Sequence, residues 1–360
     1  MLIFNYNTTI QPYYRFKPLK NLSVINKRFY STSRYNAEDA VTRFIPSLEK
    51  EEIKNSQIIK IKDKELCPHW VTGFADAESS FSLKTSMKST AKSGWNVIPE
   101  FRIELHSREI ILLRKIKDYF GTGIISERLD RNAVVYSVQS VTDILNVIIP
   151  HFDKYPLVTQ KRADYILFKQ AINLLDLKVQ SNIEGIYKII AIKASINTGL
   201  SDKLKNSFPD VYPVDRPLIK FEGFHPNWLA GFTDGEGCFY VNTKKANTST
   251  GYQIIMTFSI SQHIRDEELL TKIKDYLDCG NIEKVSTRPT SATIVVYKFT
   301  SIKDKIIPFF CKYPLQGVKS LDFKDFCRIS NILVTKEHLT LEGVKKIKSL
   351  KSGMNSSRIL

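Results

Sequence analysis

Two glutamates, Glu78 and Glu236, occupy matched places in two closely similar segments that lie 158 residues apart. Residues 70–81 read WVTGFADAESSF and residues 228–239 read WLAGFTDGEGCF. In a helix that ends at the glutamate, the carboxylate meets the negative end of the helix dipole, at a cost of about 0.3–1 kcal/mol. A bound cation would relieve that cost. Because no His/Cys ligand pattern accompanies these acids, we expect Glu78 and Glu236 to bind Mg²⁺ or another divalent cation, rather than to be solvated helix-end acids.

Two lysines, Lys161 and Lys319, occupy matched places at the same spacing. They follow Thr159 and Gly317, which we expect to be the N-caps of a long helix in each half. A cation in the first turn of a helix opposes its dipole, so helix stability does not explain these lysines.

The chain is a repeat, since this register holds over most of its length. KYPL occurs at 154–157 and 312–315, and IKDY at 116–119 and 273–276. We expect one domain over residues 66–205 and a second over 226–360. Residues 206–225 join them and contain Pro209, Pro213 and Pro217, which favour a stiff, extended connector.

Each copy has the pattern of an α+β domain. A helix ending at the glutamate precedes a strand in which apolar Phe81 and Leu83, or Phe239 and Val241, alternate with polar residues. We expect next a second strand and an amphipathic helix ending near Tyr119 or Tyr276. Further strands ending at Val138 and Phe299 should follow, and then a final long helix from about Thr159 or Gly317. Helices should cover one side of the sheet and leave the other side polar.

Small residues line one face of each glutamate-bearing helix. Glycine costs roughly 1 kcal/mol in a helix interior, so its repeated use favours close contact between two helices over ordinary packing on a sheet. The predicted interface residues are Thr72, Gly73, Ala77, Ala230, Gly231 and Gly235.

Residues 66–360 resemble the LAGLIDADG homing endonucleases, in the single-chain form with two motifs that is common in fungal mitochondrial introns. The resemblance lies in the paired glutamate-bearing segments, in the YPL stretch of each half and in the matching C-terminal tails of the two copies. The resemblance implies two αββαββα units related by a pseudo-twofold axis, whose antiparallel sheets form a saddle over DNA. It also implies that Glu78 and Glu236 are catalytic and that Lys161 and Lys319 lie near the active site. There a lysine would stabilise charge on the scissile phosphate, with phosphate binding or solubility as the alternative.

One position departs from the family pattern. Ser79 stands where the family usually has glycine, as at Gly237. If that residue needs a positive φ, serine costs about 1 kcal/mol or shifts the end of the first helix.

The polar strand faces are candidates for reading base edges, because a two-stranded ribbon fits the major groove. His106 and His263 form a matched pair that we assign to structure or DNA contact rather than to metal. The predicted DNA-binding residues are Ser80, Ser82, Lys84, Arg102, Tyr240, Asn242 and Lys244, with Glu104 and His106 as extensions of that face.

The composition indicates a polyanionic partner. The 360 residues include 53 Lys and Arg against 37 Asp and Glu, a net charge of +16. Nucleic acid is the commonest partner for such a surplus. The sequence contains no run of about 18 apolar residues, so it predicts no membrane span. The five cysteines show neither zinc-ligand spacing nor a disulfide framework, and this cysteine pattern fits a reducing compartment.

The N-terminal region, residues 1–50, reads as a basic extension. Its first 37 residues contain no Asp or Glu, which is typical of a mitochondrial transit peptide and equally of an unfolded basic arm or a translated leader.

The leading functional hypothesis is a monomeric, metal-dependent endonuclease that cuts both strands of a long, asymmetric DNA target in the mitochondrion. Two alternatives are an RNA maturase that assists splicing of its own intron, and a DNA-binding relative inactivated by Ser79.

Overall fold

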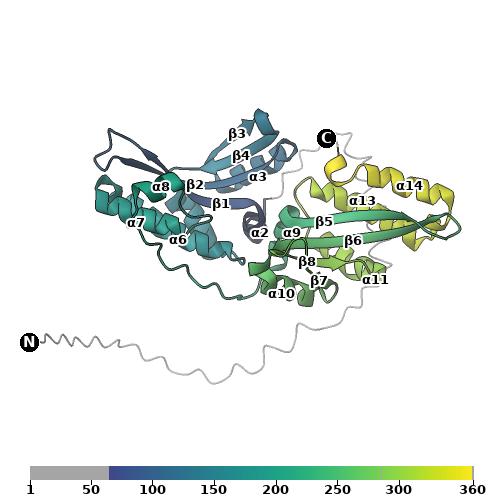
Figure 1. The fold of residues 1–360 in the computed structure, drawn as a ribbon. Helices are drawn as coiled ribbons and strands as arrows, with labels where there is room; N and C mark the ends of the chain where they lie inside the picture. Colours follow the sequence, from purple (N-terminus) through teal and green to yellow (C-terminus); the bar gives the residue numbers. More distant parts are fainter. Residues whose placement is uncertain (1–64, 285, 359–360) are drawn as a thin grey trace, which may run out of the picture.

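The computed structural model describes residues 65–284 and 286–358 and consists of two units of the same architecture (Figure 1). The N-terminal extension predicted for residues 1–50 lies outside the described residues. The first unit contains α2 (Pro68–Glu78), β1 (Ser79–Met87), β2 (Trp95–His106), α3 (Ile110–Phe120), β3 (Ile124–Arg128), β4 (Ala133–Val138), α4 (Val141–Asp143), α5 (Ile149–Lys154), α6 (Lys161–Asp176), α7 (Ile183–Ala194) and α8 (Asp202–Ser207).

The second unit repeats this order without a counterpart of α8. It contains α9 (Pro226–Glu236), β5 (Gly237–Lys245), β6 (Tyr252–His263), α10 (Glu267–Leu277), β7 (Asn281–Glu283), β8 (Ser291–Val296), α11 (Phe299–Ser301), α12 (Ile307–Lys312), α13 (Lys319–Val334) and α14 (Leu341–Ser352). The αββαββα arrangement implied by the family resemblance is confirmed.

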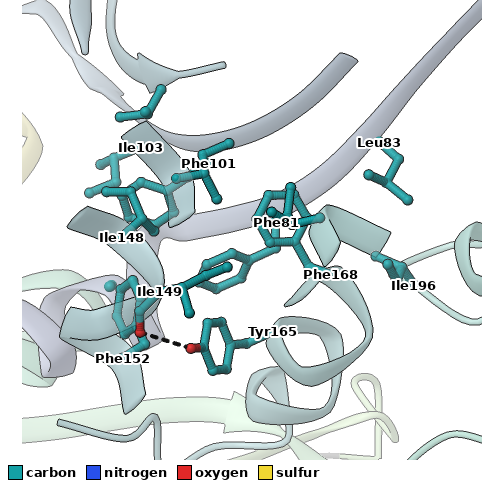
Figure 2. Close-up of a cluster of buried hydrophobic side chains, with 14 of the residues drawn as sticks. Phe81, Leu83, Phe101, Ile103, Ile148, Ile149, Phe152, Tyr165, Phe168 and Ile196 are labelled. Atoms are coloured by element: carbon teal, nitrogen blue, oxygen red, sulfur yellow. Dashed lines mark hydrogen bonds between the residues drawn. The ribbon is translucent and has the colours of Figure 1, made fainter. Parts of the chain in front are cut away.

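Each unit holds one antiparallel sheet of four strands, in the orders β1-β2-β4-β3 and β5-β6-β8-β7. Alternate residues at the start of β1 and β5 are buried in the core, as the period-2 pattern predicted, whereas Val134–Val138 of β4 are buried on both faces. In the first unit Phe81, Phe101 and Phe168 are fully buried together, and the Tyr165 hydroxyl donates to the carbonyl of Ile149 at 3.0 Å (Figure 2). The helices therefore cover one face of each sheet and leave the other uncovered.

The helices α2 and α9 lie side by side at the centre of the molecule, between the two sheets (Figure 1). Each begins at a proline, Pro68 or Pro226, whose fixed φ suits the first helical position. The sheets extend outward from this central helix pair.

The connector after α8 lies along the first unit instead of standing free. The N–H of Val214 donates to the carbonyl of Ala191, and the hydroxyl of Ser195 donates to the carbonyl of Val214. Arg216 forms an ion pair with Asp164 at 2.6 Å. Contacts with the first unit, as well as proline stiffness, therefore hold this segment in place.

Three boundaries differ from the sequence prediction. α6 and α13 begin at Lys161 and Lys319, with Gln160 and Val318 as N-cap residues, so Thr159 and Gly317 are not the caps. β8 ends at Val296, three residues before Phe299. Among the described residues, the structure has no helix that is both long and apolar enough to span a membrane.

Candidate active site at the junction of the two motif helices

Both motif helices end in extended backbone, which corrects the expectation for Ser79. Ser79 has φ −89° and Gly237 has φ −80°, so neither position requires glycine for a positive φ. The Ser79 hydroxyl instead donates to the carbonyl of Ala75 at 2.6 Å. Ser79 therefore fits the helix end without backbone strain.

Glycine is needed at 237 for a steric reason. A Cβ there would lie 2.4 Å from Cγ2 of Thr233. In the first unit the residue at the place of Thr233 is Ala75, which leaves room for Ser79. The two ends thus use complementary pairs, Ala75 with Ser79 and Thr233 with Gly237.

The glycines at the helix crossing leave no space for a side chain. A Cβ at Gly73 would lie 1.9 Å from the carbonyl oxygen of Trp228, and one at Gly231 would lie 2.0 Å from that of Trp70. A Cβ at Gly235 would meet that of Ala77 at 2.3 Å. Backbone therefore meets backbone along α2 and α9.

The other two predicted interface residues face the first unit. The Thr72 hydroxyl donates to the carbonyl of Tyr155 at 3.0 Å and contacts Nε2 of His151, so it is directed into its own unit instead of toward α9. Ala230, at the matched place in α9, is fully buried in the apolar cluster of the first unit.

A reciprocal pair of Trp–Asp hydrogen bonds joins the two helices. Nε1 of Trp70 donates to Asp234 at 3.1 Å, and Nε1 of Trp228 donates to Asp76 at 2.7 Å. Each aspartate also accepts backbone N–H groups from the segment just before α6 or α13 of its own unit. Asp76 and Asp234 are therefore buried structural acceptors.

Glu78 and Glu236 are half-buried and lie near each other. Burial raises the pKa of Glu78, and the ammonium groups of Lys319 and Lys161 oppose that rise. Burial and then the neighbouring Glu78 raise the pKa of Glu236. The Glu78 side chain lies against Gly235 of α9, where a Cβ would be 3.1 Å from its Oε1. Both acids thus converge on the junction.

Lys161 and Lys319 bind the carboxyl ends of the motif helices. Nζ of Lys161 donates to the carbonyls of Ala75 and Ala77 at 3.1 and 3.3 Å. Nζ of Lys319 donates to those of Thr233 and Gly235 at 3.0 and 2.7 Å. Burial lowers the pKa of both lysines, so these are not ordinary solvated surface lysines. An ammonium group therefore supplies the cation that each helix end requires.

Comparison with known proteins identifies the family. The model of the LAGLIDADG endonuclease family matches residues 71–172 and 229–330, one match in each unit. The chain belongs to the LAGLIDADG endonuclease family.

Fungal and structural relatives agree with this assignment. "Probable intron-encoded endonuclease 3" of Neurospora crassa is 39% identical over 286 residues, covering 78% of this chain and 53% of the relative. "Probable intron-encoded endonuclease 2" of the same fungus is 37% identical, covering 80% and 65%. The chain thus spans between half and two thirds of these curated relatives.

The structure of the meganuclease I-SmaMI bound to uncleavable DNA superposes with a TM-score of 0.80 at 40% identity, covering 82% of this chain and 99% of that chain. This agreement extends over both units, so the paired-sheet fold of the LAGLIDADG chain is that of the solved meganuclease.

Several functional-site residues of the LAGLIDADG chain were not predicted from its sequence. Nε2 of Gln262 donates to Oε1 of Glu236 at 2.9 Å. The sheet registers place Leu105 at the matching position of the first unit, so Glu78 has no equivalent amide donor there. This difference makes the surroundings of Glu78 and Glu236 unequal, and the aligned repeats could have revealed it.

A second reciprocal contact ties α6 and α13 to the opposite unit. Asp266 accepts the backbone N–H of Gln160 at 2.8 Å, and Glu109 accepts that of Val318 at 3.1 Å. Each carboxylate thus lies at the positive N-terminal end of α6 or α13. These contacts fix the helices that carry Lys161 and Lys319 across the junction.

The candidate DNA-reading residues lie on the uncovered sheet faces, but two are engaged in ion pairs. Lys84 contacts Glu100 at 2.7 Å, and Glu100 also accepts from Gln139. Arg102 is paired with Glu104. Ser80, Ser82 and Asn242 are half-buried, while Tyr240 and Lys244 are exposed.

His106 and His263 accept the backbone N–H groups of Arg108 and Arg265, so both shape the turn after the second strand. Asp164 and Asp322 are structural acids, paired with Arg216 and Arg358. Within residues 65–284 and 286–358, the structure shows no cluster of three or more Cys, His, Asp or Glu side chains that could hold a metal.

Proposed function

We propose that this LAGLIDADG chain is a site-specific DNA endonuclease that cuts both strands of its target. The observation that carries the proposal is the convergence of Glu78 and Glu236, with Lys161 and Lys319, on one junction between the uncovered faces of two sheets. The related meganuclease I-SmaMI has also been solved bound to cleaved DNA, which supports the same activity here.

The junction suits a hard divalent cation. Its donors are carboxylate oxygens from two half-buried glutamates whose pKa values are raised. A bound cation would favour the ionised form of both carboxyl groups. We propose that Glu78 and Glu236 hold Mg²⁺ together with phosphate oxygens of the substrate. I-SmaMI has been solved on an uncleaved DNA target in the presence of calcium ions, which supports a divalent cation. Such a cation would activate water and stabilise the leaving oxygen.

The residues around the acids position them for this chemistry. Gln262 holds Oε1 of Glu236 by a hydrogen bond, and the lysines fix the ends of both motif helices. The lysine ammonium groups also supply positive charge where a phosphate would gain negative charge. The glycine contacts between α2 and α9 keep the two acids at one separation.

Recognition of the target would be divided between the two sheets. Tyr240, Asn242 and Lys244 would read one half-site. The other half-site would be read by Ser80 and Ser82, together with the ion-paired Lys84 and Arg102. The outward residues differ between the units, so the target is asymmetric. We place the activity in the mitochondrion, with the chain acting as a monomer on double-stranded DNA.

The test is to replace each glutamate by glutamine. Glu78→Gln and Glu236→Gln should each abolish double-strand cleavage in magnesium while leaving DNA affinity within about threefold. The target is first found by sequencing the cut ends of a duplex library. Glu184→Gln, an exposed acid in the first turn of α7, is the matched control and should cut normally.

Undiminished cutting by either active-site variant would refute the assignment. The maturase alternative predicts that both variants still assist splicing of the intron RNA, in which case the acids have no role in that activity. Inactivity caused by Ser79 loses its basis, because the backbone at Ser79 does not require glycine.

A further inference from the structure

A pair of cysteines, Cys311 of α12 and Cys327 of α13, meets on the second unit. The two residues are half-buried and free, and a hydrogen bond joins their thiols. They pack against the apolar core of this unit. They lie 16 positions apart in the sequence, with no spacing motif that marks them as a pair.

The first unit shows what this position holds in the other copy. The matching residues, 158 positions earlier, are Asp153 and Lys169, which form an ion pair at 2.6 Å. Tyr165 donates to the same aspartate at 2.7 Å, and its counterpart in the second unit is Phe323. The polar side chains of this network in the first unit are therefore replaced by two thiols and a phenylalanine in the second.

We propose that Cys311 and Cys327 are a modification site, forming a reversible disulfide with each other through exchange with a low-molecular-weight disulfide such as oxidised glutathione. The proposal rests on the thiol contact between α12 and α13 and on the equivalent side-chain bridge in the first unit. It does not depend on the endonuclease activity.

The reaction is two thiol–disulfide exchanges. The Cys311 thiolate attacks one sulfur of oxidised glutathione, forming a mixed disulfide and releasing one glutathione thiolate. The Cys327 thiolate then attacks the Cys311 sulfur and releases the second glutathione. The two protein thiols lose two electrons and two protons in total, and one glutathione disulfide becomes two glutathione thiols.

The environment assigns the order of attack. The hydrogen bond from Cys327 lowers the pKa of the Cys311 thiol, whereas that bond and burial raise the pKa of the Cys327 thiol. Cys311 is therefore the better nucleophile, and Cys327 resolves the mixed disulfide. Sulfur atoms in a disulfide lie about 2.0 Å apart, so side-chain rotation must bring the contacting thiols closer.

The cross-link would close a loop that supports the candidate active site. Residues 312–326 include Gln316 and Gly317, whose N–H groups bind Asp234, and Lys319, which binds the end of α9. Linking α12 to α13 restricts the opening of this loop. Oxidation should therefore raise the melting temperature by roughly 5–10 °C.

The test uses the full chain in its folded state. The protein is incubated with oxidised glutathione, free thiols are alkylated, and the digest is analysed by mass spectrometry. A peptide pair linking Cys311 to Cys327 is expected, about 2 Da lighter than the sum of the reduced peptides. It should disappear after reduction, and Cys67, Cys238 and Cys279 should remain open to alkylation.

The matched control rebuilds the pair of the first unit. The double variant Cys311→Asp/Cys327→Lys should fold and show the same melting temperature with and without oxidised glutathione. Stable glutathione adducts without the linked peptide would overturn the proposal. An equal rise in melting temperature for wild type and the double variant would overturn it as well.

Discussion

The contact between α2 and α9 makes a quantitative prediction for Gly231→Ala. The new Cβ would lie 2.0 Å from the carbonyl oxygen of Trp70, 2.9 Å from the backbone nitrogen of Phe74 and 2.9 Å from the carbonyl carbon of Trp70. All three atoms are backbone and cannot rotate away. The two helices must therefore move apart by on the order of 1 Å, since a real Cβ needs ordinary van der Waals separation.

The expected cost has three parts. Overpacking of this kind costs roughly 1–3 kcal/mol. Separation of the helices weakens the Trp70–Asp234 hydrogen bond, and a bond to a charged group contributes roughly 1.5–3 kcal/mol. Alanine regains about 1 kcal/mol in helix propensity. The net loss in the free energy of unfolding is roughly 1.5–5 kcal/mol.

The assay is urea unfolding followed by tryptophan fluorescence, to which Trp70 and Trp228 at the helix contact and Trp95 of β2 contribute. Gly353→Ala is the matched control, because its Cβ would meet only the Leu350 carbonyl oxygen, at 3.7 Å. It should change stability by less than about 0.5 kcal/mol. If Gly231→Ala unfolds at the wild-type urea concentration, the two helices do not meet backbone to backbone and the geometry of the junction is wrong.

Four further predictions follow from the site. Gln262→Leu removes the hydrogen bond to Glu236, so it should slow cutting of one strand by roughly 10-fold and accumulate nicked DNA. Leu105→Ala should leave the cutting of that strand unaffected. Gel analysis with each strand labelled measures both rates. The acid limb of the cleavage-rate profile should lie above pH 4.5, the ordinary pKa of glutamate. Burial raises the pKa of Glu78 and Glu236, so their cation-binding ionised form is lost as pH falls through the raised values. The alkaline limb should lie below pH 10.5, because Lys161 and Lys319 lose their protons at lowered pKa values, and a rate profile at constant ionic strength shows both limbs. Log affinity for DNA should fall linearly with log salt, by about 0.9 per neutralised phosphate, and a flat plot would place the +16 charge away from the interface. The double variant Tyr240→Ala/Asn242→Ala should relax base preference in one half-site. Lys84→Ala should affect the other half-site and leave the buried Glu100 without its cation. Cleavage of single-base target variants measures both effects, and divided recognition is refuted if both map to the same bases.

Sequence reasoning located the motif helices, the repeat and both candidate acids, because each is written in local patterns. The matched segments around Glu78 and Glu236 need no knowledge of distant contacts, and alternation at Phe81 and Leu83 assigns a strand and its inner face. The glycines at 73 and 231 indicated a close helix contact for the same reason: their helix-propensity cost is visible in the sequence alone.

The tertiary structure alone decided which groups meet across the junction. Trp70 and Asp234 are 164 positions apart, and no periodicity links them. The role of Lys161 at the end of α2 required the fold to bring α6 beside that helix. The backbone conformation at Ser79 was likewise open, since an extended residue after a helix is as compatible with serine as with glycine. Local preference determines elements, whereas burial and hydrogen bonding between distant elements determine the partner of each polar group.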